Sequence, residues 1–529
     1  MFKHCPIIVA FSGFVVLAVG ILCTWYGFPK LVKMQIDQNI AIQEGTNAFE
    51  MWQKQSFPLS YKIYFFNVTN PAAVMGGDKP ILKEIGPYIY NIYIERQIIK
   101  IDEKTDTIQY HLKKHYVFNT TASGCRNDDD VVTVINMALM GTALKVHGMF
   151  PAMLSLVYSA LPYLYPGISD VFLRAKVKDI LFNGITLYCS APEIESICMM
   201  MKAAQPASMK LSENGQDFIF SLFGAYNDTL LGPFNMTRGL TNTTRGELLS
   251  YKDEEELDFW DDGVCNMING SDSGLFFPMK EPTDKLYTFI PEVCRSVAVD
   301  FEKKVELHGI QFYRYASTEA ALSHSGPNKC FCDQVDDNEY ECPAEADKKL
   351  LDYADGLKPV QDLHESLLII EPKTATPLKG AKRTQMNVEM KQIKNFPLLE
   401  NVSEGVFPIL WIEEGADLPE DLVKLLADSF TKMAALEYIK WILIIGGIVL
   451  MLVSFGLVIY QEKLMCFSNS GKAKLNEGAI FTTRNSSLPP INTSMVYPRD
   501  SINLTECFNA NVNNQNDRSV DQRVQNVVL

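Results

Sequence analysis

The strongest constraint on this chain is an uninterrupted apolar run near its C-terminal end. Residues 441–460 (WILIIGGIVLMLVSFGLVIY) are 20 residues without an Asp, Glu, Lys, Arg or His. An α-helix of that length spans roughly 30 Å, the thickness of the hydrocarbon core of a bilayer. Tyr438, Trp441 and Tyr460 lie at its ends, where amphipathic rings favour the membrane surface. The sequence therefore predicts a transmembrane helix at 438–460.

A second uncharged run, at 5–28 (CPIIVAFSGFVVLAVGILCTWYGF), is also long enough to span a bilayer. A cleaved signal peptide is the alternative, but this run is longer than the apolar region of such peptides. We therefore expect an uncleaved anchor preceded by a short cytosolic N-terminus at 1–4. Two anchors place residues 29–437 on one side of the membrane and residues 461–529 on the other.

The segment between the anchors carries two signs of an oxidising, extracellular compartment. Eight of the chain's 12 cysteines lie in it. Cys330, Cys332 and Cys342 could bind metal in a cytosolic protein, but in this context they predict disulfides. The segment also contains N-glycosylation sequons, at Asn67, Asn119, Asn227, Asn235, Asn242, Asn269 and Asn401. We therefore predict a glycosylated ectodomain.

Charge and composition exclude several functions. The formal net charge is −15, and the middle segment carries all of this excess because both flanks are slightly basic. An acidic surface argues against nucleic-acid binding and against non-specific binding to anionic membranes through clusters of basic residues. The tail at 461–529 is rich in Asn and Ser without an apolar period, so we expect disorder and unused sequons there. Cys466 and Cys5, near the spans, are palmitoylation candidates.

Alternating apolar and polar residues predict strands in the ectodomain, with 57–71, 84–101 and 107–118 as the clearest cases. Further strands are expected between 285 and 315, at 366–371 and 385–389, and near 406–415. His111 and His115 could share a metal on a helix, but on a strand they lie too far apart, so surface histidines are expected. No metal, cofactor or catalytic motif is recognised, which predicts a non-enzyme.

The stretch at 131–173 differs from its surroundings because Lys145 and Asp170 are its only charged residues. A third span at 148–169 is one interpretation, but its three prolines disfavour it, and it would place sequons on both sides of the membrane. We expect short apolar helices that are partly exposed. An exposed apolar patch usually marks a partner, lipid or ligand site; the alternative is that these helices pack only against each other.

Several short sequence motifs, in this order along the chain, resemble motifs of the class B scavenger receptor family. They are YFFNVTNP at 64–71, E-x-GPY at 84–88, CRS at 294–296, IEPKTATPLKGAKRTQMNVEM at 370–390 and FPILWIEEG at 407–415. DILFNGI at 179–185 and FIFSLFG at 218–224 are most similar to the insect sensory neuron membrane proteins. The resemblance runs from 28 to about 460, between the two predicted anchors.

The resemblance implies a two-span membrane hairpin with a large α+β ectodomain. Its core would be an antiparallel β-barrel with an internal hydrophobic tunnel and a helical apex far from the membrane, at 131–173. A ligand would enter at this apex, and the candidate contacts are Met149, Phe150, Met153, Leu154, Leu156, Val157 and Leu161. Scavenging members carry a basic apex for anionic ligands. Here Lys145 stands almost alone, which favours neutral or small fatty ligands.

The family's disulfide pattern implies the bonds Cys265–Cys330 and Cys332–Cys342 and leaves Cys294 unpaired. The family's turn D-G-L-x-P, at 355–359, follows Cys342 after only 12 residues. The sixth cysteine of the pattern and one strand are therefore missing from this sequence, through splicing or an error in the gene model. Loss of a strand would open an edge in the barrel.

These features favour a plasma-membrane receptor or co-receptor that binds fatty-acid-derived ligands such as pheromones. It would pass them to the membrane or to a neighbouring odorant or pheromone receptor, with a carrier protein as a further partner. One alternative is an uptake receptor for lipid particles or apoptotic cells. Another is a two-span channel subunit, which needs polar pore-facing groups that these spans lack. An ectoenzyme is the third.

Overall fold

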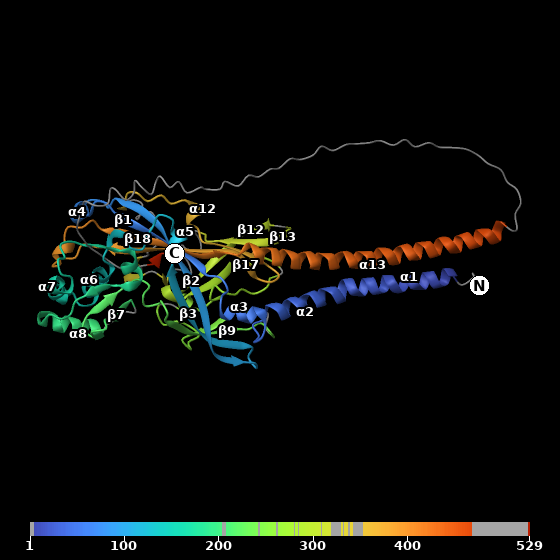
Figure 1. The fold of residues 1–529 in the computed structure, drawn as a ribbon, viewed down its shortest axis with the longest axis horizontal. Coiled ribbons are helices and arrows are strands. Elements are labelled where there is room, and N and C mark those ends of the chain that lie inside the picture. Colours follow the sequence, from blue (N-terminus) through green and yellow to red (C-terminus); the bar gives the residue numbers. More distant parts are fainter. Residues whose placement is uncertain are drawn as a thin grey trace, which may run out of the picture. The chain divides into compact units, whose positions relative to one another are not determined.

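The chain forms two structural units, Met1–Gln35 with Asp428–Asn514 and Ile36–Ala427 with Gln515–Leu529 (Figure 1). They are seen in a computed structural model that describes residues 5–203, 208–241, 244–260, 263–279, 281–283, 285–307, 309–318, 330–331, 333–336, 339–341, 353–467 and 527–528. We call the first the membrane unit and the second the ectodomain.

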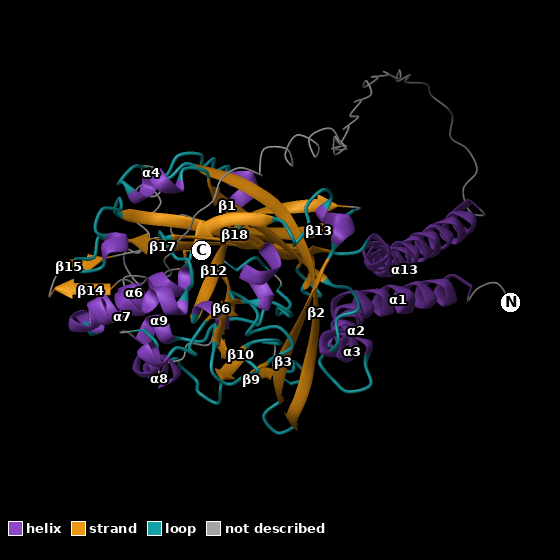
Figure 2. Cartoon of the chain, turned by 60° about the vertical axis from the view of Figure 1, so that its left-hand side comes forward, coloured by secondary structure: helices purple, strands orange, loops and turns teal. Residues whose placement is uncertain are grey.

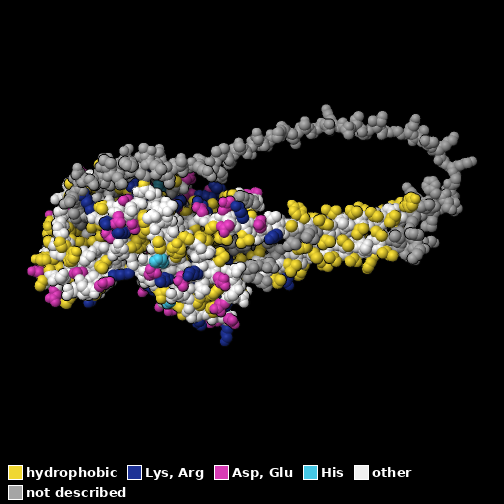
Figure 3. Space-filling model, viewed as in Figure 1, with side chains coloured by type: hydrophobic (Ala, Val, Ile, Leu, Met, Phe, Trp, Pro, Cys, Tyr) yellow, Lys and Arg dark blue, Asp and Glu magenta, His cyan; other side chains and the backbone are white. Residues whose placement is uncertain are grey.

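The membrane unit consists of long apolar helices. They are α1 (Cys5–Leu22), the π-helical turn η2 (Cys23–Gly27), most of α2 (Phe28–Ile40) and most of α13 (Glu420–Phe467). Two stretches of these helices, Ile8–Leu31 and Trp441–Tyr460, are long and apolar enough to cross a membrane. Figure 3 shows hydrophobic side chains along both. α13 ends at Phe467, beyond the predicted boundary at 460, and residues 468–526 and 529 of the predicted tail lie outside the described residues.

Small residues allow the two spans to approach closely. A Cβ on Gly447 would lie 2.7 Å from the backbone nitrogen of Leu17, and one on Gly13 would lie 3.0 Å from Cβ of Leu450. Contact of this kind is how helices associate in lipid, where apolar side chains gain little by burial.

The ectodomain is built on one large antiparallel sheet (Figure 2). Its order is β10-β9-β3-β2-β1-β18-β17-β16-β13-β12-β11. The strands are β1 (Leu59–Val68), β2 (Leu82–Asp102), β3 (Thr107–Phe118), β9 (Leu230–Thr237), β10 (Leu248–Tyr251), β11 (Lys285–Ile290), β12 (Arg295–Leu307), β13 (Ile310–Ala316), β16 (Leu367–Glu371), β17 (Thr376–Met390) and β18 (Gly405–Asp417).

Period-two alternation sets which face of each strand is buried. On β1, Tyr61, Ile63 and Phe65 are buried, whereas Lys62 on the opposite face pairs with Glu413 of β18. The hairpin of β2 and β3 occupies the two stretches in which the sequence predicts strands. The sheet therefore has an inner, mostly apolar face and an outer face that carries charge.

The two ends of the sheet, β10 and β11, are joined by the segment 269–271. The amide of Leu248 donates to the carbonyl of Gly270 at 2.8 Å, and the amide of Phe289 donates to the carbonyl of Ser271 at 2.9 Å. Gly270 has a φ of +79°, and a Cβ there would lie 1.9 Å from the carbonyl oxygen of Tyr287. Only glycine fits, so this residue permits the sheet to close into a barrel.

The expected open edge is absent between the strands that flank the shortened region. β13 pairs directly with β16, with Tyr313 opposite Ile370. The described sheet therefore runs without a gap from β12 to β17, and the expectation of an edge opened there is wrong. The segment that the resemblance predicts to be shortened lies between β13 and β16, and this part of the chain holds the small hairpin β14 (Asp333–Asp336) and β15 (Glu339–Glu341).

Short helices gather at one end of the sheet (Figures 1 and 2). They are α6 (Met137–Met149), η3 (Pro151–Met153), α7 (Leu154–Leu164) and α8 (Glu195–Ala203). We call α6, α7 and α8 the apical helices. Phe150, which is not helical, separates α6 from η3, so this region is no third span, and short helices are what the sequence predicts here.

Smaller elements complete the ectodomain. They are β4 (Val131–Ile135) paired with β5 (Phe172–Lys176), the sheet β6 (Ile185–Leu187), β8 (Phe218–Phe220) and β7 (Met209–Leu211), and α3 (Asn47–Gln53), α4 (Pro71–Met75), α5 (Thr120–Ser123), η4 (Asp179–Asn183), η5 (Pro192–Ile194), α9 (Gly263–Asn266), η6 (Pro291–Val293), α12 (Gln361–His364) and η9 (Pro397–Leu399).

A two-residue strand, β19 (Val527–Val528), pairs with β17. That pairing puts the end of the tail beside the ectodomain sheet. The cytosolic tail, which would lie across the bilayer from the ectodomain, stays a prediction.

Two buried arginines organise the ectodomain. Arg96 contacts Asp272 at 2.8 Å and donates to the carbonyl of Trp52 at 2.6 Å. Arg245 donates to the carbonyls of Ile40, Phe276 and Thr374. Ile40 is the last residue of α2, so the guanidinium of Arg245 satisfies a free carbonyl at the negative end of a helix.

Candidate functional site

The apical helices divide the predicted ligand contacts into two groups. Leu154, Val157 and Leu161 are at most 3% exposed, because their spacing of three and four puts them on the inner face of α7. Phe150 is 53% exposed and Leu156 45%. Met153 is half-buried, and the side chain of Met149 lies outside the described part of the chain. The seven residues therefore do not line one surface: three pack inward, and two face outward.

Other apolar side chains on this part of the chain are exposed as well. On α7, α8 and the segments beside them, the exposed apolar residues are Phe150, Leu156, Tyr163, Tyr188, Met199 and Met200. Methionine adapts its shape to different apolar partners. An exposed group of this kind on the apical helices is a candidate contact surface for lipid or for a partner.

Beneath this surface the apical helices are tightly packed. The small cavity between α6, α7 and α8 has a volume of about 10 Å³ and is lined by apolar side chains that include Leu139, Val157, Leu164 and Met201. Ligand pockets are usually several hundred Å³. The inward-facing group therefore forms a closed core here, and a fatty chain could pass this level only if α7 and α8 separate.

Disulfides hold the region beside the apical helices. Cys189 and Cys198 are bonded, with Cα atoms 5.9 Å apart, which ties α8 to the chain after β6. Their nine-residue separation in a cysteine-poor stretch is a signal that the sequence analysis did not use. Cys265 is bonded to Cys330, and Cys125 is also disulfide-bonded.

Two further predictions concern Cys294, expected to be unpaired, and the bond between Cys332 and Cys342. Cys294 is a free thiol in the left-handed backbone conformation, and burial raises its pKa. The predicted Cys332–Cys342 bond lies outside the described residues.

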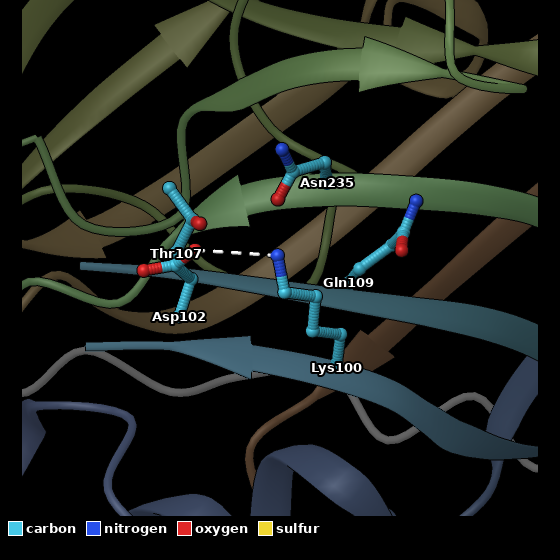
Figure 4. A pocket seen from close by; sticks show the side chains of 5 residues that line it. All are labelled: Lys100, Asp102, Thr107, Gln109 and Asn235. Carbon is cyan, nitrogen blue, oxygen red and sulfur yellow. Dashed lines mark hydrogen bonds and ion pairs between the residues drawn. The ribbon is translucent and has the colours of Figure 1, made fainter. Parts of the chain in front are cut away.

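The predicted glycosylation sites lie on the surface to different degrees. Asn401 is exposed, whereas Asn67, Asn119, Asn227, Asn235 and Asn269 are half-buried, and Asn242 lies outside the described residues. Asn235 borders a polar hollow of about 160 Å³ on the outside of β2, β3 and β9 (Figure 4). Lys100, Gln109 and Asn235 form one cross-strand row there. None of the described sequon asparagines is fully buried.

The two histidines of β3 lie on a strand, and His115 pairs with a carboxylate at the surface. Nδ1 of His115 lies 2.7 Å from Asp228, which also pairs with Lys113 at the surface. Hydrogen bonds from His115 and Lys113 hold the pKa of Asp228 below its usual range. Among the described residues there is no group of three or more His, Cys, Asp or Glu that could hold a metal ion.

The inner face of the barrel contains charges that the sequence analysis missed. Nζ of Lys114 lies 2.8 Å from Glu292 and 3.6 Å from Glu414, and Lys382 also pairs with Glu414. Desolvation raises the pKa of Glu414, but Lys114 and Lys382 outweigh it and lower the pKa to about 2. Strand alternation could have indicated this, because Lys114 lies on the same face of β3 as the buried Tyr110 and Leu112.

These observations define a membrane protein with two apolar terminal helices and a large ectodomain built on a nearly closed antiparallel barrel. The family model described as the CD36 family matches residues 11–458. The chain therefore belongs to the CD36 family, the class B scavenger receptors.

Several relatives match over most of their length. The chain is 38% identical to sensory neuron membrane protein 2 of Heliothis virescens over 484 residues, which cover 85% of this chain and 93% of that protein. It is 36% identical to sensory neuron membrane protein 2 of Manduca sexta over 478 residues, or 84% of this chain and 92% of that protein. It is 31% identical to sensory neuron membrane protein 1 of Apis mellifera over 453 residues, or 82% and 87%.

Proposed function

We propose that this chain is a plasma-membrane receptor or co-receptor with both termini in the cytosol. It binds hydrophobic, fatty-acid-derived ligands at the apical helices and passes them to the membrane or to a neighbouring chemosensory receptor. The observation that carries the proposal is the exposed apolar group around Phe150, Leu156 and Met199. The names of the relatives support the sensory setting.

The charges near the apical helices support an apolar ligand over an anionic one. Lys176 and Lys178, at the end of this region, both pair with Asp129, at 2.7 and 2.9 Å. Their charge is thus largely neutralised locally, and the exposed lysines of the apical helices themselves are Lys145 on α6 and Lys202 on α8. A fatty chain gains about 0.8 kcal/mol for each methylene buried, so it needs no ionic anchor.

The closed packing of the apical helices adds a step to the proposed mechanism. The ligand first adsorbs on the exposed group, and its chain then displaces α7 from α8 to reach the barrel interior. The Cys189–Cys198 bond keeps the first turn of α8 attached to the chain after β6 while α7 and α8 separate. Met-rich α8 can repack around a chain at low cost because methionine side chains are flexible.

The test compares substitutions on the exposed group with a matched control. Phe150→Asp and Leu156→Asp place a charge on the proposed contact surface without disturbing the inward-facing core. Both should reduce transfer of a fluorescent fatty ester from micelles to membranes holding the full chain, with surface expression unchanged. Lys145→Ala, also exposed, should leave transfer unaltered. Normal transfer by both Asp variants, or its loss in Lys145→Ala alone, would show that uptake occurs elsewhere or depends on charge.

The proposed transfer to a sensory receptor needs a separate test. An odorant or pheromone receptor co-expressed with this chain should respond to lower concentrations of a hydrophobic ligand, delivered with a carrier protein, than the receptor alone. The Leu156→Asp variant should remove that gain. An unchanged dose response would leave lipid binding in place and exclude the co-receptor role.

A further inference from the structure

A polar hollow lies against β2, β3 and β9, near the turn of the β2–β3 hairpin (Figure 4). Its volume is about 160 Å³, and it is lined by Lys100, Asp102, Thr107, Gln109 and Asn235. Lys100 stands opposite Gln109, and Gln109 opposite Asn235, so side chains from three neighbouring strands surround one space. Asn235 is also the first residue of a predicted glycosylation sequon. The hollow therefore lies where a glycan on Asn235 would begin.

The alternation of side chains directs Asn235 away from the core of the barrel. Phe234 and Met236, on either side of it in β9, are at most 1% exposed, whereas Asn235 is half-buried. Gln109 of β3 is likewise half-buried and precedes the fully buried Tyr110. The hollow is therefore on the outer face of the barrel and separate from the interior route proposed for lipid.

The side-chain amide of Asn235 differs from those of two other predicted glycosylation sites. The atom that would carry a sugar, Nδ2, donates to the carbonyl of Val68 at 3.4 Å in Asn67 and to Oδ1 of Asn91 at 3.1 Å in Asn119. Asn235 makes no such bond to any residue that the structure describes. Its amide lines the hollow instead, so a sugar attached there can pack against a polar surface without breaking a hydrogen bond.

The lining suits an uncharged group with several hydroxyls. Nζ of Lys100 lies 3.2 Å from Asp102, so these two charges balance. Nε2 of Gln109 donates to Oδ1 of Asp253 at 2.7 Å, which orients the amide of Gln109 at the wall. The hydroxyl and acetamido groups of N-acetylglucosamine can donate to and accept from side chains of these kinds. An apolar group would leave the same side chains without partners.

The size of the hollow favours a sugar of the chain's own glycan over a free ligand. Pockets for free small molecules usually measure several hundred Å³, and this one is smaller. A group that is covalently attached to the wall needs only weak contacts, because the attachment gives it a high effective concentration.

We propose that this hollow holds the first N-acetylglucosamine of a glycan on Asn235, with Lys100 and Gln109 as its hydrogen-bonding partners. The sugar then joins β2, β3 and β9 on the outside of the barrel. The inference is independent of the proposed lipid function, and it requires that Asn235 is glycosylated as the sequence predicts.

The test measures how fast peptide N-glycosidase F releases each glycan from the full chain, produced in human cells, held in lipid nanodiscs and mapped by mass spectrometry. The enzyme must reach the first sugar, so a sugar in the hollow is cleaved only when it leaves. Release at Asn235 should be slower than at the exposed Asn401, and denaturation should remove the difference. Lys100→Ala and Gln109→Ala each remove one hydrogen bond and should speed release at Asn235 about 3- to 10-fold. Lys104→Ala, exposed in the turn of the same hairpin and outside the hollow, is the matched control and should change neither rate.

Each other outcome would overturn the inference. An unmodified Asn235 leaves the hollow without its occupant. Slow release that neither alanine variant changes would show that the strand itself limits the enzyme. Equal acceleration by Lys104→Ala would indicate a general loosening of the hairpin. Lys100→Met keeps the alkyl stem and removes only the amine, and it replaces Lys100→Ala if the alanine lowers the thermal midpoint of the protein.

Discussion

The buried pair of Arg96 and Asp272 provides a quantitative test of how the ectodomain is held together. Both side chains are at most 5% exposed, and one carboxylate oxygen of Asp272 accepts from Nε of Arg96 at 3.0 Å and from its Nη2 at 2.8 Å. The same oxygen accepts from the hydroxyl of Tyr110 at 2.7 Å. Desolvation raises the pKa of Asp272, but Arg96 and Tyr110 outweigh it and hold the pKa below its usual range.

Asp272→Asn removes the negative charge and leaves the guanidinium buried without a counter-ion. Breaking a buried pair in this way costs about 3–5 kcal/mol. Unfolding entropy grows with chain length, so for a domain of this size each kcal/mol lowers the thermal midpoint by roughly 1–2 °C. We expect a fall of roughly 3–10 °C in the thermal midpoint of the full chain in nanodiscs, measured by differential scanning fluorimetry.

Two further variants make this result specific to the pair. Lys424→Ala removes the exposed i,i+4 pair with Glu420 and should shift the midpoint by less than 1 °C, because surface pairs contribute little. The double variant Arg96→Met, Asp272→Asn leaves no uncompensated charge and should recover part of the loss. The reasoning would be refuted if Asp272→Asn lowered the thermal midpoint as little as Lys424→Ala does. It would also be refuted if the double variant lost more stability than the sum of the losses in Arg96→Met and Asp272→Asn alone.

Three other results are expected. Gly270→Ala should prevent barrel closure and appear as loss of surface expression, because its Cβ would overlap the backbone of Tyr287. Arg245→Met leaves buried carbonyls unsatisfied and should cost roughly 3 kcal/mol or more, measured as a lower thermal midpoint and faster proteolysis near residue 40. The pKa of Glu414 is about 2 in the folded chain and near 4.3 in the unfolded chain. Its ionised form therefore contributes roughly 2–3 kcal/mol to the free energy of unfolding above the unfolded pKa, and this contribution is lost as the pH falls toward 2. The difference in stability between wild type and Glu414→Gln should shrink over that range of pH.

The sequence predicts the parts of this fold that depend on local patterns. The two spans follow from length and composition, and β3 follows from alternation. The short apical helices follow from prolines in an uncharged stretch. Each of these depends on residues within about 20 positions of one another, where periodicity carries the signal.

Contacts between distant residues could not be predicted in the same way. Lys114 reaches Glu292 and Arg96 reaches Asp272 across more than 170 positions. Charged residues are usually solvated, so their composition indicates surface, and only strand alternation hints that Lys114 points inward. The division of the apical residues also needs a structure, because Leu156 and Val157 are adjacent in sequence yet lie on opposite faces of α7.

The segment that closes the barrel is also a glycosylation sequon, Asn269-Gly270-Ser271. In the folded chain Ser271 is 3% exposed, its hydroxyl accepts from the amide of Ser273, and its backbone bonds to β11. An enzyme that must grip the sequon in an extended form cannot reach it once these bonds exist. If Asn269 is glycosylated as predicted, sugar transfer therefore has to come before closure during synthesis. The fraction of chains glycosylated at this asparagine would therefore report when the barrel closes during synthesis. Early closure would leave Asn269 unmodified, and late closure would allow its glycosylation.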